Sequence, residues 1–465
     1  MYAGFFALLF LYLASVLLGW EFYFYLFLFC AIVFIASSIR FEVGFLVVPL
    51  ALANPYMLKE TGTHLHLSEL VLIIIFVVFV GRVILLKEKI NFPREFLVPA
   101  SVLILASTIS LAVARYYVVG IEQIVRYLEI LLAFFVVVLY ASRTERRAYH
   151  NFVSLMLGGG IASAIGVGQF VINAVELRQT TRVFGWLGGG YGALVASTFI
   201  LSLSALWYMK DKPLKILALV TLPLSAVALL LSQTRAWIGA LLLVLIFIML
   251  MERAGARRKF LFIAGIATGM LIILWQTDMF GVLRNNIFAG AMQGAFRFGQ
   301  SQQEHSLNDF SLFLRFNAWR KAAELYITHP ILGIGVGNVR FTDYITLKLG
   351  TPGEGVGYVD NQYLQVFAEA GTIAGIAWIM YVYRAVRTGI RGVRKSVDPH
   401  LHGLAVAFLG CLLIYVLGSC FWVISPEHES FAMMILYAGL SINVCTLVQG
   451  IEVKERSENG ERSGC

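Results

Sequence analysis

Several charged side chains lie beside long apolar runs, where a membrane protein can place chemistry on a polar substrate. Arg235 ends the polar step Ser232-Gln-Thr-Arg between two apolar runs. Arg315 and Asp360 lie in a polar interruption over residues 277–366, and strongly hydrophobic blocks flank it. Charges at such positions are costly, and they usually face the protein interior or a water-filled cavity. We therefore predict that this interruption carries the reaction site.

Two of these residues also have a purely structural interpretation. Arg235 can reach the membrane boundary with its charge while its stem stays in apolar surroundings. Asp360 directly precedes the helix expected to enter the membrane at Tyr363, so its carboxylate can serve as an N-cap. Both interpretations stay open on the residues alone.

An amphipathic helix is predicted inside the polar interruption. It should end by Thr328, because the residue before Pro330 disfavours helical backbone. Its mixed face indicates that it lies along the membrane surface and does not cross it. The residues on that face are Arg315, Trp319, Ala322 and Tyr326. The following run, Gly333-Ile-Gly-Val-Gly337, lacks the third-glycine spacing of a dinucleotide motif, so we expect a tight turn.

The composition identifies an integral membrane protein. Of 465 residues, 59% are hydrophobic and 14% are charged, against about 25% charged in soluble proteins. Repeated apolar runs of roughly 20 residues predict an all-α polytopic fold of about 12–14 transmembrane helices, with one long extracytoplasmic loop that contains amphipathic helices. The expected spans are 4–19, 22–39, 41–55, 69–86, 96–114, 118–141, 151–173, 187–208, 214–231, 236–251, 258–276, 367–388, 401–423 and 431–449.

The charge pattern predicts the orientation. Alternate loops carry Lys/Arg clusters, at 87–94, 143–147, 210–215, 253–259 and 384–395. Such clusters mark cytoplasmic loops, so both termini are expected inside and the 277–366 loop outside. We divide the chain into N-terminal membrane helices (1–276), this loop (277–366), C-terminal membrane helices (367–449) and a cytoplasmic polar tail (450–465).

Other features exclude some classes of function. The basic residues lie in short loops beside spans, so nucleic acid is not an expected partner. The five cysteines lie mostly inside apolar runs without paired spacing, which predicts neither disulfides nor a metal site. Glu122, Arg126 and Glu129 share a helical face within one span. They either line a cavity or form a structural ion pair.

Four motifs follow one another in the chain. They are Arg182-Val-Phe-Gly185, Ser232-x-Thr-Arg235, Arg315-x3-Trp319 followed by His329-Pro-Ile-Leu-Gly-Ile-Gly-Val-Gly-Asn338, and Asp360-Asn-x-Tyr-Leu-Gln with Ala368-Glu-Ala-Gly371. In this order they resemble the motifs of the O-antigen ligase/polymerase family of bacterial glycan-assembly proteins, and the resemblance covers roughly residues 180–375. At the position of Asp360 the ligases commonly have histidine, so the aspartate favours a polymerase or a ligase-like relative.

The resemblance implies a glycosyltransferase of the inner membrane. It would move a glycan from a polyprenyl (undecaprenyl) pyrophosphate carrier onto an acceptor hydroxyl at the outer face, without a metal or cofactor, as a GT-C-like enzyme. Arg235 and Arg315, with Arg182 as a third, would bind the pyrophosphate. Asp360 would be the base or would orient the acceptor. Further contacts to the glycan or acceptor are expected from Trp319, Asn361, Tyr363 and Gln365.

A transporter or flippase of lipid-linked sugars is the main alternative. A bundle of this many spans suits either class, but transporters usually contain internal repeats and broken helices. No clear repeat is visible here, and the polar residues gather at one predicted face. The acceptor and the sugar stay open, as does the choice between polymerase and ligase.

Overall fold

The computed structural model describes eight stretches of the chain, which are residues 21–53, 67–87, 93–176, 190–232, 234–252, 307–339, 359–422 and 428–462. These stretches form helices and short connections. The helices before the polar interruption are α2 (Glu21–Ile39), α3 (Phe41–Phe45), α4 (Val47–Ala53), α5 (Leu67–Leu86), α6 (Arg94–Ser110), η2 (Leu111–Val113), α7 (Tyr117–Tyr127), the π-helical η3 (Leu128–Phe134), α8 (Phe135–Ala141), α9 (Glu145–Glu176), α10 (Tyr191–Tyr208), α11 (Lys212–Leu231) and α12 (Arg235–Met251). The later helices are α16 (Leu307–Thr328), α17 (Gln362–Lys395), α18 (Pro399–Gly418) and α19 (His428–Arg462).

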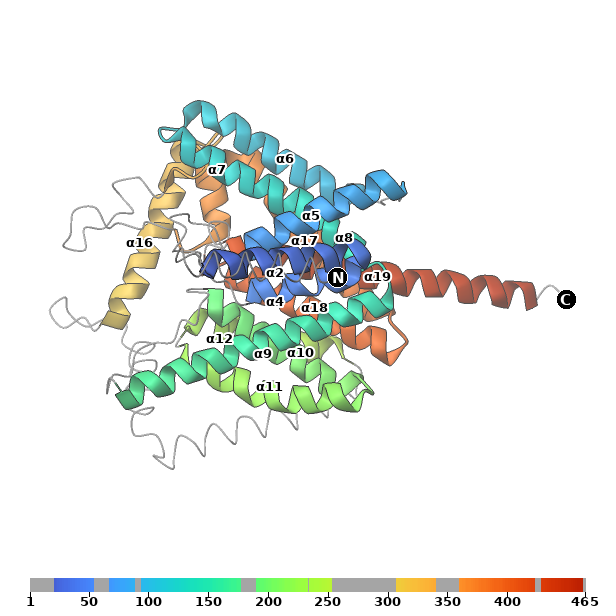
Figure 1. Cartoon of the computed structure of the whole chain (residues 1–465). Coiled ribbons are helices and arrows are strands. Elements are labelled where there is room, and N and C mark those ends of the chain that lie inside the picture. Colours follow the sequence, from blue (N-terminus) through green and yellow to red (C-terminus); the bar gives the residue numbers. More distant parts are fainter. Residues whose placement is uncertain are drawn as a thin grey trace.

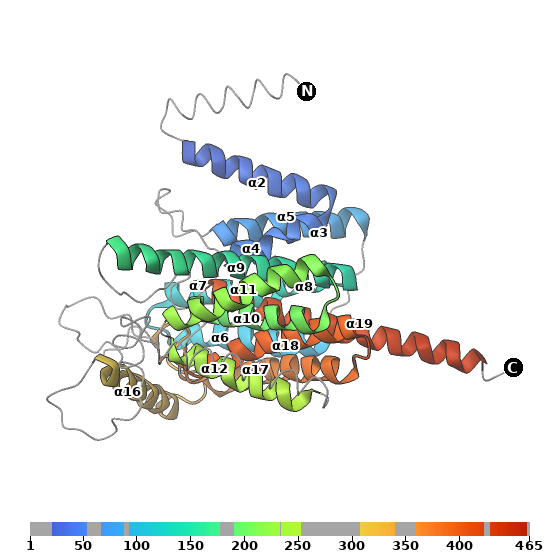
Figure 2. The ribbon, with the colours of Figure 1, turned by 90° about the horizontal axis from the view of Figure 1, so that it is seen from below.

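The long helices lie side by side in one bundle (Figures 1 and 2). Among the described residues, nine helices are long and apolar enough to cross a membrane. The most completely buried of these nine are α10, α18 and α19, which form the centre of the bundle. Peripheral helices such as α5 expose aliphatic side chains, for example Leu85 and Ile84. The all-α polytopic fold predicted from composition is thereby confirmed.

The span expected over 41–55 is wrong. Two short helices, α3 and α4, occupy it instead, and the chain turns between them at Leu46. The physical cause is Pro49, which lacks an N–H and whose ring disfavours a helix through the carbonyl of Phe45, four residues earlier. The expected spans 4–19 and 258–276 lie outside the described residues.

The described basic loops gather at one end of the bundle. Polar contacts there join the starts of α9, α11 and α18 to the end of α12. The pairs are His400 Nδ1 with Glu145 Oε1 at 2.8 Å, Tyr149 OH donating to Asp211 Oδ2 at 2.8 Å, and His402 Nε2 with Glu252 Oε1 at 3.0 Å. Arg384, near the end of α17, donates to the carbonyl of Glu95 at the start of α6. This arrangement agrees with the alternation of basic loops in the sequence.

Helix α16 lies at the opposite end. In Figures 1 and 2 it runs across the ends of the other helices, whereas α19 extends beyond the bundle on the far side. Helix α16 ends at Thr328, as the following proline predicts. Its partner is the first part of α17, which begins at Gln362, inside the range assigned to the polar interruption. The division of the chain into four segments otherwise stays a prediction.

Candidate active site

The centre of the candidate site is an ion pair between α16 and the start of α17. Arg315 Nε donates to Asp360 Oδ2 at 3.2 Å, across 45 residues of sequence. The two side chains are 25% and 32% exposed, so both are open to a ligand and partly shielded from water. The structure therefore brings together two of the three residues predicted to be catalytic.

Asp360 is free to make this pair because it does not cap α17. The cap is Asn361, whose Oδ1 accepts the N–H of Leu364 at 3.0 Å, so the alternative in which Asp360 serves only as N-cap is wrong. Asp360 has a φ of 51°, in the left-handed region of backbone conformation. Left-handed backbone is uncommon outside glycine, although aspartate tolerates it better than most residues, and it often occurs at functional sites.

The predicted face of α16 packs against α17. Trp319 donates its indole N–H to the backbone carbonyl of Asp360 at 3.4 Å. One turn further, Ala322 is completely buried in a small hydrophobic cluster with Val359 and Ala368. Tyr326 ends the stripe, with its hydroxyl 3.1 Å from the Thr372 hydroxyl. The interpretation of this stripe as one helical face is confirmed.

The environment of Asp360 determines its acidity. Burial raises the pKa of the Asp360 carboxyl above its usual value. The charge of Arg315 and its hydrogen bond act in the opposite direction but do not reverse the shift. From the sequence alone, burial and a neighbouring arginine are expected to shift the pKa of Asp360 in opposite directions. In the folded protein the effect of burial is larger, so the carboxylate is a stronger base than a free aspartate.

A break in α17 positions the connection that follows α16. Gly371 interrupts the helix with φ 77° and ψ −171°. The backbone of the glycine run fills the gap. The N–H of Thr372 donates to the Pro330 carbonyl at 2.8 Å, and the N–H of Ile334 donates to the Ala368 carbonyl at 3.0 Å. At the break, backbone groups of α17 therefore form hydrogen bonds with the connection after α16 in place of bonds within the helix.

The glycine run forms tight turns, as predicted. Gly333, Gly335 and Gly337 all have positive φ. A Cβ on Gly333 would lie 2.4 Å from the backbone of Glu369, so the run packs directly on α17. These glycines serve close packing of protein backbone, and the rejection of a dinucleotide site agrees with this geometry.

Asn338 holds the far end of the run in place, a role that was not predicted from the sequence. Its Oδ1 accepts the N–H of Tyr116 at 2.7 Å, and its Nδ2 donates to the Val336 carbonyl at 3.0 Å. The N–H of Val336 donates in turn to Ser110 Oγ at 3.1 Å. The α6–α7 connection therefore helps to position α16 and Arg315. An asparagine that closes a glycine run was the one available signal.

Arg235 is the first residue of α12. The start of this helix packs against the end of α18, because a Cβ on Gly418 would lie 1.7 Å from the ring of Trp237. The next residue, Ser419, accepts the N–H of Gln362 on its carbonyl at 2.9 Å. The beginnings of α12 and α17 thus meet at one turn, which places the backbone of Arg235 at the same end of the bundle as Asp360.

The remaining predicted contacts differ in what they bind within the protein. Asn361 is the helix cap, and Tyr363 donates its hydroxyl to the Val416 carbonyl at 3.0 Å. Gln365 is buried and donates to Glu369 Oε1 at 3.2 Å, while its Oε1 has no partner among the described residues. The side-chain oxygen of Gln365 therefore remains available as a hydrogen-bond acceptor. Arg182 lies outside the described residues.

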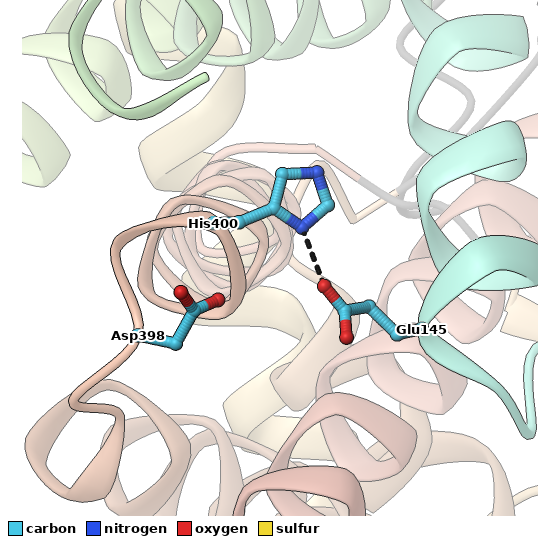
Figure 3. Close-up of side chains that lie close together, drawn as sticks. All are labelled: Glu145, Asp398 and His400. Atoms are coloured by element: carbon cyan, nitrogen blue, oxygen red, sulfur yellow. Dashed lines mark hydrogen bonds and ion pairs between the residues drawn. The ribbon is translucent and has the colours of Figure 1, made fainter. Parts of the chain in front are cut away.

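A separate polar cluster lies at the basic end of the bundle. Glu145, Asp398 and His400 have ligand atoms within 4.8 Å of one another and could hold a metal ion (Figure 3). His400 already pairs with Glu145, and Asp398 caps α18 by accepting the N–H of Leu401 at 3.0 Å. The cluster joins α9 to α18 at the opposite end of α18 from the site, so it is not part of it.

Glu122, Arg126 and Glu129 differ in their exposure. Glu122 is exposed and the other two are half-buried, where α7 passes into the π-helical η3. A π-helical stretch inside a span often marks a functional position. Here it lies on the side of the bundle formed by α6 and α7 (Figure 1).

Comparison with known proteins gives one match. Residues 220–379 match the family model described as O-antigen ligase (Wzy_C). The matched segment includes Arg235, Arg315 and Asp360, whereas Arg182 precedes it. No curated protein matches the chain. The family match supports assignment to the O-antigen ligase/polymerase family and, with it, a glycosyl-transferring enzyme of the glycan ligase or polymerase type.

Proposed function

We propose that the protein transfers a glycan from a polyprenyl pyrophosphate carrier to an acceptor hydroxyl. The premise of this proposal is the match to the O-antigen ligase family model. The reaction would take place at the end of the bundle where α16 lies, on the outer face of the inner membrane. The observation that carries the proposal is the pair of Arg315 and Asp360, in which a cation suited to phosphate adjoins a carboxylate suited to an acceptor hydroxyl.

The reaction forms one bond and breaks one. The acceptor oxygen attacks the anomeric carbon, and the bond from that carbon to the carrier's phosphate oxygen breaks. The acceptor proton passes to Asp360, and the electron pair leaves with the pyrophosphate. Arginines stabilise the negative charge that grows on this leaving group, and stabilisation of that kind lowers the reaction barrier.

The geometry of Arg315 suits this double role. Its Nε donates a hydrogen bond to Asp360, and no hydrogen bond or ion pair of its two terminal amino groups is found among the described residues. These groups can therefore bind a phosphate while Nε keeps the base in place. Asp360 likewise uses Oδ2 for the arginine, which leaves Oδ1 to accept a proton from the acceptor. Arg235 would supply the second cation from the start of α12, and Arg182 is proposed as a third.

The decisive experiment incubates the purified protein with a polyprenyl-pyrophosphate oligosaccharide alone and resolves the products on a gel. A ladder of glycans would identify a polymerase. Products that form only after a separate acceptor is added would identify a ligase. If neither condition yields a new glycosidic bond, transfer is contradicted.

Transport of lipid-linked sugars is the alternative that this experiment addresses. The break at Gly371 is a feature that transporters share. In this protein the break is filled by backbone from the connection after α16, and the ion pair lies beyond it at the helix start. A transporter would move the substrate across vesicle membranes without new bonds.

A further inference from the structure

Three aromatic rings form a continuous group beside the ion pair. Phe316 and Trp319 on α16 have ring centroids 5.4 Å apart, and Trp319 lies 5.8 Å from Phe421 in the turn after α18. Phe316 is 55% exposed and Phe421 is 45% exposed. These half-exposed faces lie beside Arg315 and Asp360, where they are available to a ligand with an apolar surface.

The aromatic group contacts Asp360 through Trp319. The indole N–H of Trp319 donates to the backbone carbonyl of Asp360, and Arg315 comes from the same helix as Phe316 and Trp319. An apolar surface and a charged hydrogen-bonding pair thus lie side by side. A ligand that fills both must present an apolar face and hydroxyl groups close together.

We propose that Phe316, Trp319 and Phe421 bind a pyranose ring of the acceptor glycan. This inference rests on the proposed transfer reaction and adds a binding site to it. One face of a pyranose presents C–H groups, and the face of an aromatic ring carries the negative part of its quadrupole, so the two attract each other. The hydroxyl groups at the edge of the sugar reach the carboxylate. The acceptor, not the donor, occupies this position because the rings adjoin the base that takes the acceptor proton.

Phe421 is the residue on which the inference can be tested most sharply. It comes from a different segment than α16, and its exposure makes a folding defect on substitution small. Phe421→Ala removes the ring, Phe421→Leu keeps apolar bulk without a ring, and Phe421→Trp restores an aromatic face. Ile327→Ala is the matched control, because Ile327 is 73% exposed on the far part of α16.

The measurement is the steady-state kinetics of transfer with a defined acceptor oligosaccharide. We expect Phe421→Ala and Phe421→Leu to raise the KM for the acceptor by about tenfold and to change kcat little. Phe421→Trp should restore the KM, and the control should match the wild type. Equal KM values for Phe421→Leu and the wild type would overturn the inference and indicate an apolar contact with lipid instead.

A binding measurement separates this inference from the proposed reaction. The soluble acceptor glycan is titrated into Asp360→Asn protein and into Asp360→Asn/Phe421→Ala protein, both of which keep the carrier site. Weaker binding to the double variant supports the aromatic site even if no transfer is observed. If the wild-type protein is active and both variants bind the acceptor glycan equally well, the aromatic site is contradicted and the transfer reaction still stands.

Discussion

At the scale of single residues, the pairing of Asp360 with Arg315 determines what each side chain can do. The arginine holds the carboxylate by one oxygen, and the asparagine that follows takes over the capping of α17. Asp360 is therefore not committed to the helix. Its raised pKa gives it more affinity for a proton than an ordinary aspartate has, as a general base requires.

Asp360→Asn keeps the size of the side chain but cannot accept a proton. We expect kcat to fall by about 10²–10⁴ because a general base contributes that factor, with little change in the binding of the carrier glycan. Kinetics and binding should be measured on the same preparation, with Asp360→Glu as the variant that retains a carboxylate. An unchanged kcat would remove Asp360 from the role of base.

The raised pKa of Asp360 also predicts a pH dependence of transfer. The base is active when deprotonated, so activity should fall as the pH decreases through the pKa of Asp360. Since burial raises that pKa, the decrease should begin at a higher pH than for a free aspartate. The pH profile of kcat/KM for the wild type and for Asp360→Asn checks this, because the residual activity of the variant should lack the acid limb.

Arg235→Ala and Arg315→Ala should each lower transfer by at least about 100-fold, because each removes a cation from the leaving group. The protein should remain folded in the membrane. Arg320→Ala is a suitable control, since Arg320 is 77% exposed and pairs with Glu324 on the same helix. Near-normal activity of both variants would contradict the proposed binding of pyrophosphate.

At the scale of elements, the break in α17 connects the site to the rest of the bundle. The glycine run occupies the break on one side, and Asn338 attaches the same run to the α6–α7 connection on the other. Helix α16 precedes the run directly. The position of Arg315 therefore depends on the contacts of Ser110 and Tyr116 with this run as well as on α17.

Gly371→Ala should destabilise the protein, because a Cβ would lie 2.0 Å from the Ile331 carbonyl oxygen and φ is 77°. The strained backbone alone costs about 1–3 kcal/mol, and the steric clash adds to this cost. The midpoint of thermal unfolding in detergent measures the effect. Gly81→Ala, where a Cβ meets nothing within 4 Å, should be neutral or slightly stabilising in its helix. Equal midpoints for the two variants would contradict the role of the break.

At the scale of the whole molecule, the bundle has two chemically distinct ends. The described basic loops lie at one end, and α16 and the ion pair lie at the other. The positive-inside rule then predicts that the ion pair lies at the outer face. In the proposed reaction, this orientation would give the site access to a glycan that has already crossed the membrane.

Labelling of single cysteines with a membrane-impermeant maleimide tests this orientation. In a protein whose native cysteines are replaced, Ile331→Cys at the α16 end should react in intact cells. Val397→Cys, at the basic end, should react only after permeabilisation. Both positions are more than 70% exposed. The reverse pattern of labelling would contradict the orientation.

The sequence by itself determined the features that depend on local pattern. Apolar length predicts the spans, proline predicts the end of α16 at Thr328, and spacing predicts the face that includes Trp319. These succeed because helix formation and burial follow from neighbouring residues. The resemblance was also readable there, and the match over residues 220–379 confirms it. The span predicted over 41–55 is wrong because Pro49 disfavours a continuous helix through this segment.

Only the tertiary structure decided which polar groups meet. The pair of Arg315 with Asp360 and the contact of Trp319 with Phe421 join segments that no spacing relates. The balance between burial and a neighbouring cation at Asp360 likewise requires the folded surroundings. Contacts over long sequence distances depend on how whole helices pack, and for that reason the candidate site was visible in the sequence only as separate residues.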